Sequence, residues 1–174
     1  MVFIVSGWSA VPFLQARPIV TTVEKTTVGS EVAVRAGGRI SVQNWIDSAS
    51  VGDVLLLGPG RFNGPIDFRG KRLTIRGAGP DTVIVGPATG STVRFENGEG
   101  RDSVLDSLTV TGGEALDGGG IHVFNASPTL QRLVLFNNRA SGLGAGLYVG
   151  GAKSFPIVRN LLFAYNDDAT PALT

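Results

Sequence analysis

An internal repeat in the second half of the chain most constrains the fold. Three nine-residue units begin at Leu105, Leu130 and Val158, so they follow one another at spacings of 25 and 28 residues. In each unit the first, fourth and sixth positions hold a large apolar residue, and the ninth holds Gly or Asn. Residues 121–123 and 147–149 recur 26 residues apart between these units. Periods of roughly 20–50 residues are the signature of repeat architectures.

A parallel β-solenoid accounts for this period. Each turn of chain would lay its short strands on those of the turn before, about 4.8 Å further along the axis. Alternate side chains then point into a narrow core, while Gly and Asn tolerate the left-handed backbone of sharp corners. A doubly wound α/β fold needs a helix after most strands, and such helices are missing here. A β-sandwich gives no reason for a repeat of about 25 residues. We therefore predict an all-β, right-handed parallel β-helix over residues 19–174.

A single helix is predicted, over residues 41–51. Ser41 is a candidate N-cap because its side-chain oxygen can accept a hydrogen bond from a free backbone amide. Gly52 is a permissive stop. An apolar face follows helical spacing and consists of Val42, Trp45, Ile46 and Ala49.

Residues 1–18 are predicted to be either an export signal or an apolar tail. Residues 1–16 are largely apolar, but no Lys or Arg precedes Arg17, so the positive region of a signal peptide is missing. The segment is too short to cross a bilayer as a helix, and no other segment is apolar for long enough. Residues 19–35 are rich in Val and Thr, which favours a strand at their end.

Composition excludes several classes of function. The 15 basic and 14 acidic residues give a net charge of +1, so no global positive field attracts nucleic acid. The absence of cysteine removes disulfide frameworks, thiol catalysis and cysteine-ligated zinc. We expect no nucleic-acid partner.

The N-terminal part of the repeat region resembles the first turns of pectate-lyase-like right-handed parallel β-helices. The matching segments are NWIDSA at 44–49, GDVLLLGPGRF at 52–62 and GKRLTI at 70–75. Residues 118–121, 127–130 and 137–140 are similar to repeats of secreted and surface β-helix proteins, and residues 163–166 match the Phe-x-x-Asn motif of polymorphic outer-membrane autotransporters. The resemblance covers residues 32–168. It implies a secreted or cell-surface protein whose helix near 41–51 caps the N-terminal end of the coil.

The C-terminal end of the coil is predicted to be open. The third unit ends eight residues before Thr174, and no capping element is visible there. An open end exposes core side chains and unpaired strand edges, so we expect an incomplete coil that can self-associate through this end.

Candidate binding residues are basic and aromatic. Arg72, Arg76 and Arg94 are expected to face outward and to align into a stripe that binds anionic glycans. Ordinary surface ion pairs with neighbouring acids, such as Asp67, are the alternative. Tyr148 and Tyr165 are the best candidates for stacking on sugar rings, on adjacent turns.

Candidate catalytic residues are an aspartate pair, two arginines and the sole histidine. Asp167 and Asp168 resemble the paired aspartates of polygalacturonase-like glycoside hydrolases, although the companion motifs are missing and a turn explains the dipeptide equally well. A polysaccharide lyase would need an Arg base, for which Arg132 and Arg159 are candidates, stacked one turn apart. The sole histidine, His122, should point outward between two inward apolar residues.

A lyase would also need a cation, often calcium. The candidate acidic ligands are loosely spaced, and a solvated loop is the favoured interpretation for all of them: Glu96, Glu99, Asp102 and Asp106. No other cofactor is expected.

Together these patterns predict an exported or surface β-helix module that binds polysaccharide or a cell-surface partner without catalysis of its own. One alternative is a relative of the polysaccharide lyases or glycoside hydrolases that lacks a complete catalytic set. A purely structural spacer is the other.

Overall fold

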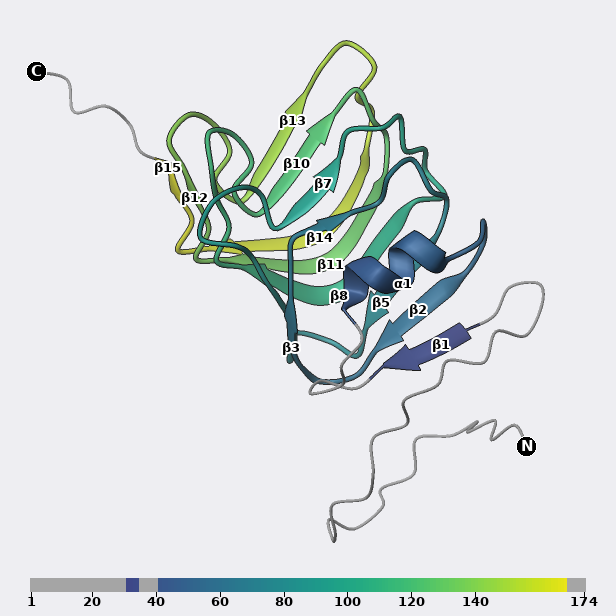
Figure 1. Ribbon diagram of the computed structural model, residues 1–174. Coiled ribbons are helices and arrows are strands. Elements are labelled where there is room, and N and C mark those ends of the chain that lie inside the picture. The colour runs from purple at the N-terminus through teal and green to yellow at the C-terminus, as the bar shows by residue number, and fades with distance from the viewer. Residues whose placement is uncertain (1–30, 35–40, 169–174) are drawn as a thin grey trace, which may run out of the picture.

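The computed structural model describes residues 31–34 and 41–168, which form a parallel β-solenoid with one short helix (Figure 1). The predicted signal or tail at 1–18 lies outside the described residues. In chain order the elements are β1 (Glu31–Val34), α1 (Val42–Ser48), β2 (Val54–Leu57), β3 (Gly60–Asn63), β4 (Ile66–Asp67), β5 (Thr74–Gly77), β6 (Thr82–Val85), β7 (Val93–Phe95), β8 (Val104–Thr111), β9 (Glu114–Ala115), β10 (Ile121–Phe124), β11 (Thr129–Phe136), β12 (Arg139–Ala140), β13 (Leu147–Gly150), β14 (Ile157–Ala164) and β15 (Asp167–Asp168).

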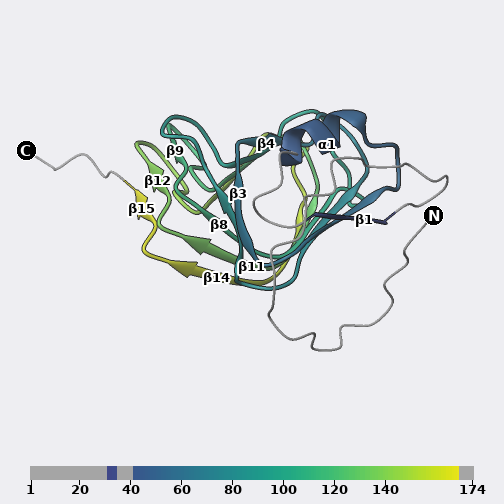
Figure 2. The same ribbon diagram turned by 60° about the horizontal axis from the view of Figure 1, so that its bottom comes forward.

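Three parallel sheets run along the coil. The first has the order β1-β2-β5-β8-β11-β14, with β3 and β6 alongside; the second has the order β13-β10-β7-β4; the third is β15-β12-β9. Figure 2 shows β8, β11 and β14 lying side by side, as their pairing requires. Strands from successive turns therefore lie next to one another in each sheet, which is the arrangement that the repeat predicts.

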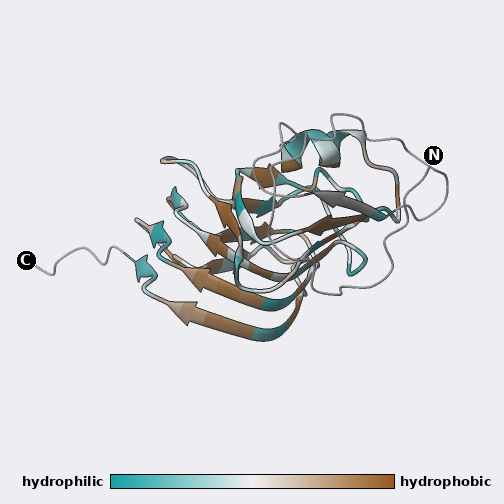
Figure 3. Cartoon of the chain, turned by 90° about the horizontal axis from the view of Figure 1, so that it is seen from below, coloured by the Kyte–Doolittle hydropathy of each residue, from teal (hydrophilic) through white to brown (hydrophobic). Residues whose placement is uncertain are grey.

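The register confirms the alignment of the three repeat units. Leu105 pairs with Leu130 and Leu130 with Val158, and the fourth and sixth positions pair in the same way. The inward residues of β8 and β11 are almost completely buried: Leu105, Leu108, Val110, Leu130, Leu133 and Leu135. Apolar residues follow the long strands, whereas polar residues lie on the short strands at the corner (Figure 3).

The long strands carry a kink that the repeat pattern does not reveal. The first part of β8 pairs with β5 and its last part with β6, so two strands of the earlier turn become one. The kink residue is Ser107 in β8, Arg132 in β11 and Asn160 in β14, each with φ between 52° and 54°. Left-handed backbone is uncommon for such residues.

The ninth position of the repeat is not the left-handed corner residue, contrary to the prediction. The left-handed residue lies one position earlier, at Gly112 and Asn137. Asn138 itself is fully buried, and its amide nitrogen donates to the Val110 carbonyl at 3.1 Å and to Asn166 Oδ1 at 3.0 Å. The ninth-position Asn therefore satisfies buried backbone groups inside the coil rather than relieving strain at a corner.

The predicted helix exists, and Ser41 is its N-cap, accepting from the Asn44 amide at 3.1 Å. It ends at Ser48 rather than residue 51 because Ala49 has extended backbone. Lys71 Nζ donates to the Ile46, Asp47 and Ala49 carbonyls, which satisfies the free carbonyls of the last turn. Three helix residues belong to the solenoid core: Val42, Trp45 and Ile46.

The last described turn leaves core positions uncovered. Val158 and Phe163 occupy inward positions of β14, yet they are 44% and 51% exposed. β14 pairs only with β11, so its other edge is unpaired within the described residues. In that same part of the chain, no helix is long and apolar enough to cross a membrane.

Candidate functional site

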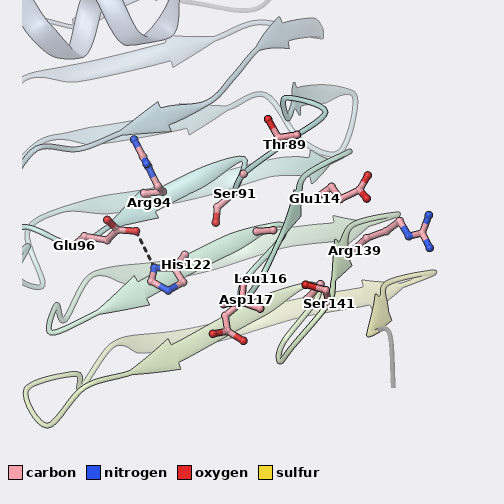
Figure 4. Close-up of a pocket in the computed structure, with 13 residues that line it drawn as sticks. Thr89, Ser91, Arg94, Glu96, Glu114, Leu116, Asp117, His122, Arg139 and Ser141 are labelled. Atoms are coloured by element: carbon pink, nitrogen blue, oxygen red, sulfur yellow. Dashed lines mark ion pairs between the residues drawn. The ribbon is translucent and has the colours of Figure 1, made fainter. Parts of the chain in front are cut away.

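A groove of about 630 Å³ lies on the outward face of the β7–β10–β13 sheet (Figure 4). Its floor comes from β7 and β10, and its wall from the segments around β9 and β12. The charged side chains that line it are Arg94, Glu96, Glu114, Asp117 and Arg139, and His122 lies among them. The groove therefore collects residues from three successive turns, which are far apart in the sequence.

The strand register builds the floor of the groove. Arg94, His122 and Tyr148 are direct partners on β7, β10 and β13. Ile121 and Val123, on either side of His122, are fully buried, so the alternation of the strand directs His122 outward as predicted. On the far side of Arg94, its guanidinium lies 3.4 Å from the Asp67 carboxylate of β4.

Three aromatic rings lie nearly parallel to one another beside the groove. The His122 ring stacks on Tyr148, with centroids 5.1 Å apart and planes 14° apart, and lies 6.3 Å from Phe124 at 20°. Gly150 permits this arrangement, because a Cβ there would lie 2.4 Å from the Tyr148 hydroxyl oxygen. The Tyr148 ring therefore lies along its own strand, over Gly150 and next to His122.

Two nitrogens that belong to the groove residues have unused hydrogen-bonding capacity. His122 Nδ1 lies 2.9 Å from Glu96 Oε1, but the direction of this contact is not that of a hydrogen bond. Among the described residues, Arg94 Nε and His122 Nδ1 are the buried side-chain atoms without a hydrogen-bond partner. A ligand would therefore meet the exposed parts of the Arg94 and His122 side chains, which are 43% and 20% accessible, rather than these two buried nitrogens.

The opposite wall is held by backbone contacts between turns. The Glu114 amide donates to the Gly90 carbonyl at 3.1 Å, which ties the β9 segment to the preceding turn. Asp117 Oδ1 accepts from the Leu143 amide at 2.7 Å. Arg139 lies 3.6 Å from Asp167 and is largely exposed. The wall thus presents both acidic and basic groups.

The predicted arginine stripe does not form. Arg76 is on β5 in the first sheet, where it contacts Asp106, whereas Arg94 is on β7 in the second sheet and contacts Asp67. Arg72 is exposed just before β5. One turn contains three strands, so residues close in sequence lie on different faces. The pairing of Arg94 with Asp67 is the surface ion pair considered as the alternative.

The two candidate tyrosines also belong to different faces. Tyr165 follows β14 and is 81% exposed, with its ring edge-on to Phe136 at 5.5 Å. Tyr148 lies on β13 beside the groove. The two tyrosines therefore do not form one sugar-stacking surface on adjacent turns.

The candidate aspartate pair has other partners. Asp168 Oδ1 accepts from the Ala145 amide, and Asp167 faces Arg139. Successive residues of a strand point to opposite faces. The structure therefore does not direct the Asp167 and Asp168 carboxylates toward one bound ligand.

The predicted direct stacking of Arg132 on Arg159 is wrong. Arg159 pairs with Gln131, because Arg132 is the left-handed kink residue and is skipped by the register. The Arg132 side chain reaches back to the preceding turn, where it donates to Asp106 and to Ser107 Oγ.

The interpretation of the acidic residues as a solvated loop is wrong for two of the four. Glu99 is buried and accepts from the Gly70 and Asn97 amides at 2.7 and 2.9 Å. Asp106 is fully buried on β8. Burial alone would raise the pKa of Asp106, but hydrogen bonds from Ser107, Gln131, Arg76 and Arg132 outweigh it, and the pKa lies below its ordinary value. Within residues 31–34 and 41–168, no three such side chains are grouped to hold a metal ion.

Comparisons with protein-family models, with curated proteins and with solved structures each returned no match. Sequence reasoning placed His122 on the outer face but missed its neighbours Glu96, Phe124 and Gly150. The signal for Phe124 and Gly150 was present, since each lies two residues after His122 or Tyr148 on the same strand face.

Proposed function

We propose that this protein is a carbohydrate-binding β-solenoid module whose groove holds a polysaccharide chain without catalysing its cleavage. The observation that carries the proposal is the Tyr148–His122–Phe124 ring surface, which adjoins a groove lined by acidic and basic side chains.

The ring surface suits the apolar face of a sugar. An aromatic ring presents a flat apolar surface, and Tyr adds a hydroxyl that can bond to a ligand. Tyr148 is held in place by Gly150 beneath it and His122 beside it, so little side-chain freedom would be lost on binding.

The polar lining suits hydroxyl groups. Sugar hydroxyls both donate and accept, and the groove offers acceptors on Glu96, Glu114 and Asp117 and donors on Arg94 and Arg139. Its volume of about 630 Å³ lies within the range of small-molecule sites, and such sites combine an apolar surface with a few polar groups.

The direction of the groove suits a polymer. Its lining comes from three turns of the coil, and successive turns are about 4.8 Å apart. A ligand that contacts all three turns must therefore extend along the coil axis, as a linear chain of sugar units would.

We also propose that the protein is exported or displayed at the cell surface, and that it is a distant relative of the pectate-lyase-like β-helices. The apolar segment 1–16 and the residue pattern at 44–75 support these two proposals. Both depend on sequence pattern alone.

Retention on a panel of soluble polysaccharides in affinity gel electrophoresis tests the binding proposal. We expect at least one polysaccharide to retard the protein, and we expect Tyr148→Ala to weaken that retardation by about tenfold, because one aromatic contact is removed. Tyr165→Ala is the matched control, since it removes an exposed tyrosine from the other sheet, and its retardation should match that of the native protein.

The same samples test the enzymatic alternative. Release of reducing ends, or of unsaturated uronate absorbing in the ultraviolet, from a retarding polysaccharide would contradict the non-catalytic part of the proposal. Absence of retardation across neutral, acidic and basic polysaccharides, or equal loss in both tyrosine variants, would contradict the binding part.

A further inference from the structure

We propose that the outward face of the β5–β8–β11–β14 sheet holds a second site, which binds a tetrahedral oxyanion, phosphate or sulfate, between the guanidinium groups of Arg76, Arg132 and Arg159. Asp106 lies at the base of this site, which we call the arginine cradle. The cradle is on a different sheet from the groove, so it does not rest on the carbohydrate proposal.

A buried carboxylate fixes two of the three arginines. Asp106 is fully buried, and its Oδ2 accepts from Arg76 Nε at 3.0 Å and also from Arg132. Ser107 Oγ donates to Asp106 Oδ1 at 2.7 Å and accepts from Arg132 Nε at 2.9 Å. The two guanidinium groups are therefore held on the same oxygen, from opposite neighbouring turns.

The arginines retain unused donors that face solvent. Within the described residues Arg76 bonds through Nε alone, and Arg132 through Nε and one terminal nitrogen. Their side chains are 48% and 52% exposed. A guanidinium held along one edge presents its other N–H groups in fixed directions, which is the geometry that recognises oxyanions.

Arg159 completes the cradle. The register places Arg76, Asp106, Gln131 and Arg159 in one row across four adjacent strands. Arg159 is exposed and forms no ion pair with any described residue. With three arginines and one aspartate, the row and its kink residue carry a net charge of +2.

The neighbouring rows do not cancel this charge. On one side the same face carries Thr74, Val104, Thr129 and Ile157, and on the other Val83, Thr109, Val134 and Leu162. All eight residues are uncharged. These rows therefore leave the exposed guanidinium edges free to bind an anionic ligand.

The charge and the number of donors favour a tetrahedral group over a carboxylate. Phosphate groups at neutral pH carry about 1.5 to 2 negative charges and sulfate carries two, which is close to the +2 of the cradle. A tetrahedral group can offer a separate oxygen to each of three guanidinium groups, whereas a carboxylate has only two oxygens.

Thermal unfolding of the whole chain at pH 7 and constant ionic strength tests the cradle. The probes are sodium phosphate, sodium sulfate, sodium acetate and glucose 6-phosphate, each titrated against sodium chloride. A ligand that binds only the folded state raises the Tm as its concentration rises. We expect phosphate and sulfate to raise the Tm and acetate to have no effect; a response to glucose 6-phosphate would show that the cradle also accepts the group as an ester.

Arg159→Gln is the decisive variant, because Arg159 has no ion pair whose loss would unfold the protein. We expect it to weaken phosphate binding by about tenfold, as loss of one charged hydrogen-bonding group does. Lys153→Gln is the matched control, since it removes one positive charge from an exposed turn between β13 and β14, and its phosphate response should be native. Equal effects of phosphate and acetate, or equal responses of the two variants, would overturn the proposal.

Discussion

At the scale of single residues, Asp106 shows how the outer face of this thin coil accommodates a fully buried charge. The carboxylate is fully buried, yet four side chains donate to it, and two of them are arginines whose outer edges remain in water. A buried charge is tolerated only when it is paired. The two sides of this ion-pair cluster therefore differ. The buried carboxylate needs the arginines as counter-charges, whereas the half-exposed arginines can be solvated without it.

This asymmetry predicts the order of two substitutions. Asp106→Asn should lower the free energy of unfolding by only about 1 kcal/mol, because the half-exposed arginines can turn into solvent. The double change Arg76→Gln with Arg132→Gln should lower it by about 3 kcal/mol, because it leaves a buried carboxylate without a counter-charge. Urea denaturation at pH 7 measures both losses of unfolding free energy. A larger loss for Asp106→Asn than for the double change would contradict this prediction.

The lowered pKa of Asp106 also predicts a dependence on pH. A carboxyl group with a depressed folded-state pKa stabilises the fold above its unfolded pKa of about 3.9, and this contribution is lost as the pH falls through the folded value. The difference in unfolding free energy between the native protein and Asp106→Asn should therefore shrink between pH 6 and pH 2.5. A difference that stays constant over this range would show that Asp106 has an ordinary pKa.

At the scale of strands and turns, the repeat predicted the stacking of apolar residues but not the polar contacts between turns. Leu105, Leu130 and Val158 align because each follows the one before by one turn of the coil. Large apolar residues at this position are stabilised by burial in the core. The repeat pattern does not indicate where one sheet ends and the next begins within a turn. Arg76 and Arg94 therefore fell on different sheets, and the left-handed kink at Arg132 was unforeseen, because an arginine carries no preference for that backbone.

The buried Asn138 gives a test at this scale. Its side chain serves the Val110 carbonyl, the Gly113 amide and Asn166, so Asn138→Ala would leave buried backbone groups unpaired. We expect a loss of about 2–3 kcal/mol in unfolding free energy, measured by chemical denaturation. Asn63→Ala, at an exposed position of β3, should change it by less than about 0.5 kcal/mol. Similar losses in both variants would contradict the internal role of Asn138.

At the scale of the whole molecule, the two ends of the described coil differ. Residues of α1 join the core near the N-terminal strands, whereas β14 leaves Val158 and Phe163 exposed beside an unpaired strand edge. Unpaired edges with apolar neighbours favour association.

Self-association through this end stays a prediction that light scattering can test. The 174-residue chain should show a mass that rises with protein concentration, and Val158→Lys with Phe163→Lys should reduce the rise, because the added charges oppose burial of this end. Leu116→Lys is a control, since Leu116 is exposed and apolar but lies beside the groove wall. A chain that stays monomeric at high concentration, or a control with the same effect, would contradict the prediction.

The candidate site was only partly predictable at this scale as well. His122 and Tyr148 were placed outward by strand alternation, but the groove depends on the segments around β9 and β12. Backbone hydrogen bonds between turns, such as that from Glu114 to Gly90, help to position those segments. Such bonds do not require particular residue types, so the sequence does not reveal them.

The most direct test of carbohydrate binding in the groove uses the fact that His122 is the only histidine of the chain. Its imidazole protons give a single set of resonances in a proton–nitrogen NMR spectrum, and these report on the groove floor without further assignment. Titration with oligosaccharides of a polysaccharide that retards the protein should shift or broaden the His122 signals in step with binding, and Tyr148→Ala should weaken that response. Binding that saturates while the His122 signals stay unchanged would show that the carbohydrate binds elsewhere, and would contradict the account.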